Sequence, residues 1–393
     1  MAESKQPHNT QHKVDSSTPN LGILCLSRSW GGLEINTVKL TRWMQARGWQ
    51  ITLFAPPDSP ALKQAQQENL LVQQLSSRSK TFSLGAARQM STYLRQQQIR
   101  VLIVTQNRDL GLVSLVKLLM GKQIHLVYQQ HMQLGPPKRD WFHTLRFRVL
   151  DAWLSPLPWL AKQVTEKTRF DPAKVHVVPL GIELASFIDP GLTKAAAREQ
   201  LGLPATSTLL GLLGRLDDGK GQDFVIEVIQ QLRTQHQRAV ELVLMGELTK
   251  NEGDEYLAKL HQLVRDYNLE QVVHFRPFSA QTEVFYRAID VFVMASTNET
   301  YGMVTIEAMA AGLPVLGTRI GGTAEIIKDG QTGLLYPVGD TEACTQAVLR
   351  CLNNPAWAQH LGQAAQQEAI REYAHERQCA LTEQIIRRVT SSE

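Results

Sequence analysis

The chain has 393 residues, 43% of them hydrophobic and 20% charged, with a formal net charge of +4. This composition indicates a globular protein, and the length exceeds the usual size of one domain, so we expect two domains. No apolar run approaches the roughly 20 residues that a membrane-spanning helix needs, and the polar first twenty residues lack the apolar core of a signal peptide.

Short apolar runs alternate with amphipathic helical stretches in the first half of the chain. We predict a helix over residues 33–47, because its apolar positions recur at three- and four-residue steps. We predict strands at Leu21–Ser27, Ile51–Phe54, Val101–Thr105, Ile124–Tyr128 and Val175–Val178. This alternation favours parallel βαβ units.

The same alternation restarts after the turn-like segment 177–183. The strands predicted there are Leu209–Leu213, Val240–Met245, Val272–Phe275, Val291–Met294 and Pro314–Leu316. The helices predicted between and after them are Gln222–Arg233, Asp254–Tyr267, Thr282–Ala288, Met303–Ala311, Thr341–Leu352 and a broken helix over Ala356–Arg388. The fold class is therefore α/β, with two Rossmann-like domains that each contain a parallel sheet.

The distribution of charge supports a domain boundary near residue 180. Residues 21–180 contain 21 Lys and Arg against 8 Asp and Glu, a balance of +13, whereas residues 181–393 contain 18 against 27, a balance of −9. We expect a disordered tail over 1–20, a first Rossmann-like domain over 21–180 and a second over 181–370. The last stretch, 371–393, is expected to be a helix that packs back on the first domain.

Four cysteines, Cys25, Cys344, Cys351 and Cys379, form no CxxC pair and no Cys/His cluster with zinc spacing. A reducing compartment is the simplest interpretation, so we expect a cytoplasmic protein. The basic first half predicts an anionic partner, either the inner face of a membrane or a phosphorylated substrate, and we expect no nucleic acid.

Gly31 and Gly32 follow the first predicted strand and precede a helix that carries Glu34. A glycine pair at a helix N-terminus lets backbone amides approach an anion and adds the favourable helix dipole. The alternative is a tight turn without a ligand, because the GxGxxG pattern of dinucleotide-binding proteins is absent.

The loop over residues 214–221, Gly-Arg-Leu-Asp-Asp-Gly-Lys-Gly, follows the first strand of the second domain. Arg215 and Lys220 could converge on a diphosphate, Arg as a bidentate fork and Lys as a point charge. Alternatively the loop is solvated, with Asp217 and Asp218 balancing the two cations.

Glu299 and Glu307 lie eight positions apart, the first in a loop after a strand and the second inside an apolar helix. A carboxylate in such a helix is costly without a hydrogen-bonding partner, and ribose hydroxyls could provide one. The amides of Gly302, Met303 and Val304 would then face a diphosphate. The alternative is a capped helix with an ordinary paired surface glutamate.

These motifs together resemble the retaining glycosyltransferases of family 4, which have the GT-B fold. The residues that carry the resemblance are GGLE at 31–34, VVPLGIE at 177–183, GRLDDGKG at 214–221, Glu299, and EAMAAGLPVLGT at 307–318. The resemblance covers nearly the whole chain after residue 20. It implies two Rossmann-like domains that face each other across a central cleft.

The resemblance also implies a role for each matching residue. Arg215 and Lys220 would bind the donor diphosphate with backbone amides of the glycine loop, Met303 and Val304, while Glu307 would hold the ribose. Glu299 and His131 would act at the reacting sugar. The donor-site residues expected from the resemblance are Gly31, Gly32, Arg215, Lys220, Tyr301, Gly302, Met303, Val304 and Glu307. Tyr301 stands where the family more often has Phe.

The expected reaction is transfer of a sugar, with retention, from a nucleotide sugar to a hydroxyl of a glycan or lipid-linked glycan. A UDP-sugar is favoured over a GDP-sugar, and no further cofactor and no metal are expected, since the chain has no Asp-x-Asp motif. Same-face attack is favoured over a covalent intermediate on Glu299. The rival functions are a nucleotide-sugar epimerase and a sugar-binding scaffold without activity.

The acceptor is expected to bind the basic first domain. Residues 137–148 mix cations with aromatic side chains, as an interfacial helix does, so this segment could contact an anionic membrane near a lipid-linked acceptor. The alternative is an amphipathic helix that packs its aromatic side chains inward.

Overall fold

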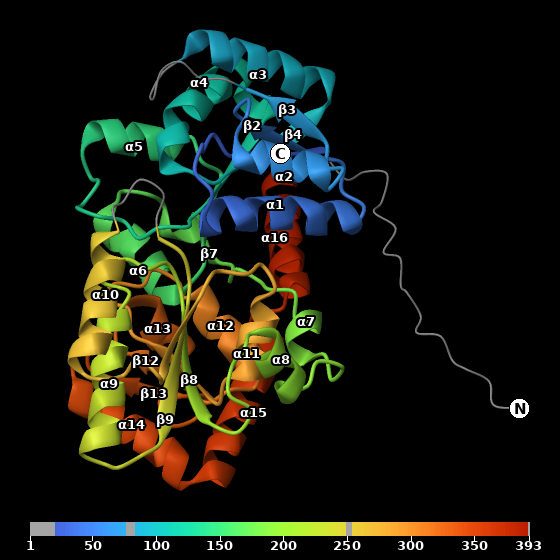
Figure 1. Cartoon of the computed structure of the whole chain (residues 1–393). Coiled ribbons are helices and arrows are strands. Elements are labelled where there is room, and N and C mark those ends of the chain that lie inside the picture. Colours follow the sequence, from blue (N-terminus) through green and yellow to red (C-terminus); the bar gives the residue numbers. More distant parts are fainter. Residues whose placement is uncertain (1–19, 76–82, 249–253, 392–393) are drawn as a thin grey trace, which may run out of the picture. The chain divides into compact units, whose positions relative to one another are not determined.

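The computed structural model describes residues 20–75, 83–248 and 254–391. The chain divides into two compact units, which are coloured by sequence in Figure 1. The N-terminal unit extends to Leu180 and also takes in the chain from Glu376 onward, and the C-terminal unit is Gly181–His375. The tail expected over residues 1–20 lies outside the described residues except for Asn20, which begins the first strand.

The N-terminal unit is built on a seven-stranded sheet in which every strand pair is parallel, in the order β3-β2-β1-β4-β5-β6-β7. Its strands are β1 (Asn20–Leu24), β2 (Ile51–Ala55), β3 (Val72–Gln74), β4 (Ile99–Val104), β5 (His125–Gln129), β6 (Ala152–Ser155) and β7 (Val175–Val177). Its helices are α1 (Gly32–Ala46), α2 (Pro60–Gln67), α3 (Leu84–Gln96), α4 (Leu110–Met120), α5 (Trp141–Arg148), α6 (Pro158–Lys167) and α16 (His375–Thr390), with 3-10 turns at Asn107–Asp109, Gly121–Gln123 and Pro172–Lys174.

Successive side chains of the central strands point to opposite faces of this sheet, and both faces are covered. Val101 and Ile103 belong to one core with α1 and α16, whereas Leu102 and Val104 belong to a second core with α3 and α4. A strand buried on both faces needs apolar residues at consecutive positions, which explains the uninterrupted apolar run over 101–104.

The C-terminal helix α16 is part of the N-terminal unit. Glu383 accepts hydrogen bonds from the Arg47 guanidinium at 2.6 and 2.8 Å and from the Trp49 indole at 3.0 Å. Cys379 and Ile386 are buried in the core that α16 shares with α1. The last helix therefore completes one face of the first sheet.

The C-terminal unit contains a six-stranded sheet, also parallel throughout, in the order β10-β9-β8-β11-β12-β13. Its strands are β8 (Thr208–Leu213), β9 (Val240–Met245), β10 (Val273–Arg276), β11 (Val291–Met294), β12 (Val315–Thr318) and β13 (Leu334–Tyr336). Its helices are α7 (Ala185–Ile188), α8 (Lys194–Gln200), α9 (Gln222–Thr234), α10 (Glu255–Asp266), α11 (Thr282–Ala288), α12 (Met303–Ala310), α13 (Gly321–Ile326), α14 (Thr341–Asn353) and α15 (Pro355–Glu372). Two parallel-sheet Rossmann-like units confirm the predicted fold class.

The predicted break in the last helix is confirmed, and it falls between α15 and α16. Ile182 donates its N–H to Tyr373 O at 2.9 Å and accepts from His375 N at 3.1 Å, so the segment after Leu180 pairs with the interruption. A Cβ on Gly181 would lie 2.5 Å from the Cα of His375, so this close approach requires glycine.

Three short strands, β3, β6 and β13, were not predicted, although the equally short β7 and β11 were. Three or four residues carry little periodic signal, and β3, with the sequence VQQ, has only one apolar residue. The first strand was predicted too long: β1 ends at Leu24 rather than Ser27. The reason is a long-range side chain, since the N–H of Leu26 donates to the Asp109 carboxylate at 3.2 Å.

Candidate functional site

In each sheet the strand order reverses at one point, between β1 and β4 in the N-terminal unit and between β8 and β11 in the C-terminal unit. Loops at the carboxyl ends of strands diverge at such a point and commonly bind ligands. The loop with Arg215 follows β8 and the loop with Glu299 follows β11, so these two predicted loops flank one reversal point.

The loop over 214–221 is held by main-chain contacts. Gly214 N donates to Met245 O at 3.0 Å, and the Gln222 side-chain amide donates to Arg215 O at 2.7 Å. Gly221 has φ 81°, and a Cβ there would lie 2.4 Å from Ala295 O. The glycine thus lets the loop pass directly against the residue that follows β11.

The structure brings Lys220 and Glu299 together. Lys220 Nζ lies 3.1 Å from Glu299 Oε2, and both side chains are largely buried, with 28% and 17% exposed. Arg215 is more exposed, at 63%, and its Nη2 lies 2.9 Å from Asp217 Oδ2. Both predicted diphosphate-binding cations are therefore paired with carboxylates of neighbouring loop residues.

The main chain around Glu299 is fixed by the adjacent glycine-rich turn. Gly322 N donates to Glu299 O at 2.9 Å, and a Cβ on Gly321, whose φ is 55°, would lie 2.1 Å from the same oxygen. Thr297 N donates to Gly219 O at 2.9 Å and links this loop to the loop of Lys220. The Lys220–Glu299 pair is thus held from both sides by backbone contacts.

Glu307 lies in α12 and contacts a tyrosine that the sequence did not single out. The hydroxyl of Tyr286, on α11, lies 3.0 Å from Glu307 Oε2 and 3.1 Å from Val304 O. Burial, followed by the charge of Glu307, raises the pKa of Tyr286 well above its usual range, so the phenol stays protonated and can donate. Tyr286 therefore gives the carboxylate the polar partner that its apolar helix requires.

The N-terminus of α12 lies between Glu299 and Glu307 in the chain. Gly302, with φ 101°, is the residue before the helix, and Tyr301 is buried. Met303 and Val304 are the first two helical residues, whose N–H groups have no partner within a helix. These amides add partial positive charge next to Glu299, because a Cβ on Gly302 would lie 3.6 Å from the Cγ of Glu299.

In the N-terminal unit, Gly31 is the residue before α1, and Gly32 is the first residue of that helix. A Cβ on Gly32 would meet nothing within 4 Å, so the fold does not itself require glycine there. Glu34 is buried in the first turn of the helix.

His131 follows β5, and burial lowers its pKa to about 4, so the imidazole is neutral near pH 7. Its Nε2 is buried with no hydrogen-bond partner among the described residues. The preceding Gln130 is fully buried and accepts from Trp153 Nε1 at 3.0 Å and Ser155 Oγ at 2.7 Å. Gln130 therefore anchors the segment that carries His131.

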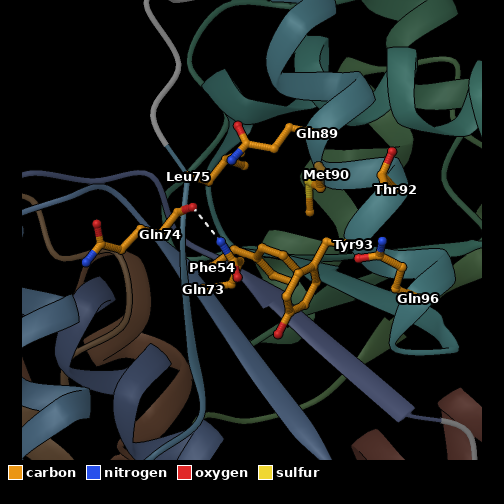
Figure 2. A pocket seen from close by; sticks show the side chains of 9 residues that line it. All are labelled: Phe54, Gln73, Gln74, Leu75, Gln89, Met90, Thr92, Tyr93 and Gln96. Atoms are coloured by element: carbon orange, nitrogen blue, oxygen red, sulfur yellow. Dashed lines mark hydrogen bonds between the residues drawn. The ribbon is translucent and has the colours of Figure 1, made fainter.

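A separate cavity of about 300 Å³ lies in the N-terminal unit between β3 and α3 (Figure 2). Phe54, Leu75 and Met90 form its buried apolar part, and Tyr93 stands beside Phe54 with ring centroids 5.5 Å apart. None of the predicted site residues lines this cavity. Across the described ranges, no three His, Cys, Asp or Glu side chains gather as metal ligands do. Nor does any described helix have the length and apolar character needed to cross a membrane.

Comparison with known proteins identifies a family for each unit. Residues 193–368 match the family model "Glycosyl transferases group 1", and residues 30–186 match "Glycosyltransferase Family 4". Among curated relatives, the D-inositol 3-phosphate glycosyltransferase of Streptomyces bingchenggensis is 34% identical over 206 residues, which are 51% of this chain and 45% of that protein. The enzyme of the same name from Streptomyces scabiei is 32% identical over 228 residues, or 56% and 50% of the two chains. The chain thus spans about half the length of these relatives.

Solved structures share the fold at low sequence identity. A glycosyltransferase from Rickettsia africae has a TM-score of 0.88 at 16% identity, covering 96% of this chain and 100% of its own. HepE from Anabaena, solved with UDP and glucose, has a TM-score of 0.79 at 21% identity with the same coverage. Glycosyltransferase family models thus match both units of the chain, and the fold that the chain shares with these solved glycosyltransferases is GT-B.

Proposed function

We propose that the chain transfers a sugar from a nucleotide sugar to a hydroxyl of a glycan or lipid-linked glycan. The observation that carries the proposal is the Lys220–Glu299 pair beside the N-terminus of α12. It places a cation, a carboxylate and helix-terminal amides at one strand-order reversal. Relatives and structural neighbours include a D-inositol 3-phosphate glycosyltransferase, an Anabaena protein solved with UDP-glucose and a sucrose-phosphate synthase, which supports a nucleotide-sugar donor.

The leaving nucleoside diphosphate gains negative charge as the bond from the sugar carbon to its phosphate oxygen breaks. We propose that Arg215, Lys220 and the amides of Met303 and Val304 stabilise this charge, which preorganised dipoles do efficiently in a partly buried site. Glu307 would hold the ribose, while Tyr301 and Gly302 would shape the turn that faces the diphosphate. This arrangement would work without a metal, with the two cations in its place.

The two ion pairs of the free chain suggest how the donor is received. Arg215 is paired with Asp217, and Lys220 with Glu299, at 2.9 and 3.1 Å. A donor diphosphate would replace both carboxylates, and Glu299 would then be released to accept hydrogen bonds from the sugar hydroxyls. Each cation would exchange one anionic partner for another. Lys220, 28% exposed, has already lost much of its water in the free chain, whereas Arg215, 63% exposed, would still have to lose water on binding.

We further propose retention of configuration by same-face attack. The acceptor oxygen would bond to the sugar carbon as the phosphate oxygen leaves, and that oxygen would take the acceptor proton. Neutral His131 and the amide of Gly32, next to Gly31, would act from the N-terminal unit on the sugar and the diphosphate. A UDP-sugar is the preferred donor, and we expect a cytoplasmic enzyme whose basic unit contacts the acceptor.

The test is a thermal-shift series with UDP, GDP, ADP and CMP on the wild type, Arg215→Ala and Arg371→Ala. Arg371 is a matched control because it is also an exposed arginine paired with carboxylates, those of Glu368 and Glu372. UDP at about 100 times its Kd should stabilise the wild type and the control by about 2.7 kcal/mol. Arg215→Ala should lose this effect.

If none of the four nucleotides stabilises the wild type, the proposed donor site is wrong. Once the nucleotide is known, analysis of the products distinguishes a transferase from an epimerase and retention from inversion. A transferase needs an acceptor, whereas an epimerase would convert the donor alone, and the anomeric proton coupling in the product reports retention or inversion. Turnover that stops on addition of EDTA would contradict metal independence.

A further inference from the structure

The cavity between β3 and α3 combines a buried apolar floor with exposed polar side chains (Figure 2). Phe54, Leu75 and Met90 are buried and form the floor, whereas Gln89 and Gln96 are exposed to solvent. Its volume of about 300 Å³ is at the lower end of the usual range for ligand pockets, about 300–1,000 Å³. The cavity therefore has room for one small ligand that the exposed side chains can reach.

Helix α3 contributes three polar side chains to the cavity from a single face. Gln89, Tyr93 and Gln96 are spaced by four and three residues, so they lie along one side of the helix, with the two glutamines about 10 Å apart along its axis. Within the described part of the chain, neither glutamine side chain nor the Tyr93 hydroxyl forms a hydrogen bond with another residue. A ligand in the cavity would meet amide donors and acceptors at both ends and an aromatic ring between them.

The lining of the cavity carries no charge. None of the nine residues that line it is Lys, Arg, His, Asp or Glu, although residues 21–180 as a whole carry a balance of +13. A phosphate or carboxylate would find no counter-charge there, and neither would a cation. Amides around an apolar floor and a tyrosine ring instead fit a neutral sugar, whose C–H face packs against apolar and aromatic groups while its hydroxyls bond to amides.

A peptide strand is a poorer fit, although β3 lies at one edge of the described sheet. Leu75 N donates to Ala55 O at 3.0 Å, so Leu75 turns its backbone toward β2 and the preceding Gln74 turns its own toward the free edge. The Gln73 side-chain amide donates to that Gln74 carbonyl oxygen at 3.0 Å. An added strand would need the same oxygen, so the edge is already covered against strand addition.

We propose that this cavity binds one neutral sugar unit of the acceptor glycan, at a subsite away from the reacting hydroxyl. Phe54 is near the end of β2 and Leu75 follows β3, so the cavity lies toward the carboxyl edge of the first sheet, the edge that also carries Gly31 and His131. Strands β3 and β1 are separated only by β2 and are therefore about 10 Å apart, which a glycan of a few units can bridge. The proposal rests on the proposed transferase function and assigns the acceptor to glycans that contain neutral sugars.

The experiment titrates the full chain with the methyl glycosides of glucose, galactose, mannose and N-acetylglucosamine and follows binding by saturation-transfer NMR. UDP is added to occupy the proposed donor site. The test variant carries Gln89→Ala and Gln96→Ala together, and the control carries Gln66→Ala and Gln67→Ala, two exposed glutamines of α2 outside the cavity. At least one glycoside should bind the wild type and the control alike, and the test variant about tenfold more weakly, the usual effect of losing two neutral hydrogen bonds.

If none of the four glycosides binds the wild type, or if the test variant binds them as the wild type does, the proposal is wrong. Both substituted glutamines are exposed, so the test variant should fold normally, which urea unfolding of the test and control variants checks. The outcome is separate from that of the donor site. Failure of UDP to stabilise the wild type would contradict the proposed function, whereas loss of glycoside binding in the test variant would still identify a sugar site in the cavity.

A second measurement asks whether the bound sugar belongs to the acceptor. Oligosaccharides of the glycoside that binds are offered as acceptors with UDP-glucose and UDP-galactose as donors. The test variant should raise the KM for an oligosaccharide acceptor by about tenfold with little change in kcat, because the subsite holds the acceptor without touching the reacting atoms. An unchanged KM would mean that the sugar in the cavity is a separate ligand, and it would overturn the assignment to the acceptor.

Discussion

Lys220 and Glu299 are 79 positions apart in the sequence, and their side chains meet with 3.1 Å between Nζ and Oε2. The contact joins the loop after β8 to the loop after β11, and Thr297 N, bonded to Gly219 O, reinforces the junction. A carboxylate that neutralises Lys220 in the free chain must compete with an incoming diphosphate. Because of this competition, substitution of Lys220 and substitution of Glu299 should have different effects on the affinity for UDP.

Glu299→Gln should leave the affinity for UDP unchanged or raise it, because Lys220 loses its anionic competitor. The same variant should transfer sugar much more slowly, since Glu299 is proposed to act at the sugar. Lys220→Ala should weaken UDP binding by about tenfold or more, as expected for loss of a charged hydrogen bond. Calorimetric titration and turnover assays measure the two effects. Equal losses of UDP affinity in both variants would contradict the competition.

Gly32→Ala should fold normally yet bind a nucleotide sugar less well. The added Cβ meets nothing within 4 Å, and alanine at a helical position gains about 0.5–1 kcal/mol over glycine. A diphosphate that approaches the backbone there would be obstructed. Gly85→Ala, also near a helix start with nothing within 4 Å, is the control. Equal donor affinity in both variants would show that the backbone at Gly32 does not approach the donor.

Glu307→Gln should weaken UDP binding by about tenfold or more while leaving the affinity for inorganic pyrophosphate unchanged, because Glu307 is proposed to hold the ribose. Tyr286→Phe should weaken UDP in the same selective way and cost about 1 kcal/mol of unfolding free energy. Tyr336→Phe is the matched control, since its buried hydroxyl bonds Met294 O at 2.9 Å. Tyr336→Phe should lose stability without losing UDP affinity. If Glu307→Gln weakens pyrophosphate binding as much as UDP binding, the assignment of Glu307 to the ribose is wrong.

His131 should make the wild type lose stability as the pH falls. Its folded pKa of about 4 lies below the usual 6.5, so its neutral form favours folding fully above pH 6.5. That contribution, up to about 3 kcal/mol, is lost as the pH falls from 6.5 to 4. Asp109, whose pKa burial raises to about 6, titrates with the opposite sign in this range, so variants are compared at each pH.

The measurement is urea unfolding of the wild type, His131→Asn and the exposed-site control His360→Asn between pH 4 and 7. The gap between wild type and His131→Asn should change by up to about 3 kcal/mol over this range, while the control stays parallel to wild type. If the free energy of unfolding changes with pH in the same way in all three proteins, His131 does not have a buried neutral imidazole.

The sequence predicted the long elements and the loops that carry the chemistry. Helix α9 and strand β9 were predicted to within one residue, because six or more consecutive periodic positions leave one consistent assignment. The loop of Arg215 and the helix of Glu307 were predicted at strand ends from glycine spacing. Strand β3, with the sequence VQQ, was missed because a short polar edge strand is defined only by pairing with β2.

Other features depended on contacts between residues far apart in the chain. Three such residues have no local sequence pattern that identifies them. They are Tyr286, which contacts Glu307, Gln130, which holds the segment of His131, and Asp109, whose carboxylate ends β1. Tyr286 lies 21 positions before Glu307, in a helix whose own periodicity already explains a buried aromatic residue. These residues could be identified from the sequence only if the strand order were already known.

By itself, the sequence determined two α/β units with parallel sheets, and the loops that hold the candidate donor residues. It could do so because hydrophobic periodicity and glycine spacing are local properties of the chain. Only the tertiary structure decided that Lys220 meets Glu299, that α16 covers one face of the first sheet, and that the Tyr286 hydroxyl meets the Glu307 carboxylate. Those facts arise from strand order and side-chain packing, which bring distant residues within hydrogen-bonding range and set the free energy of each buried charge.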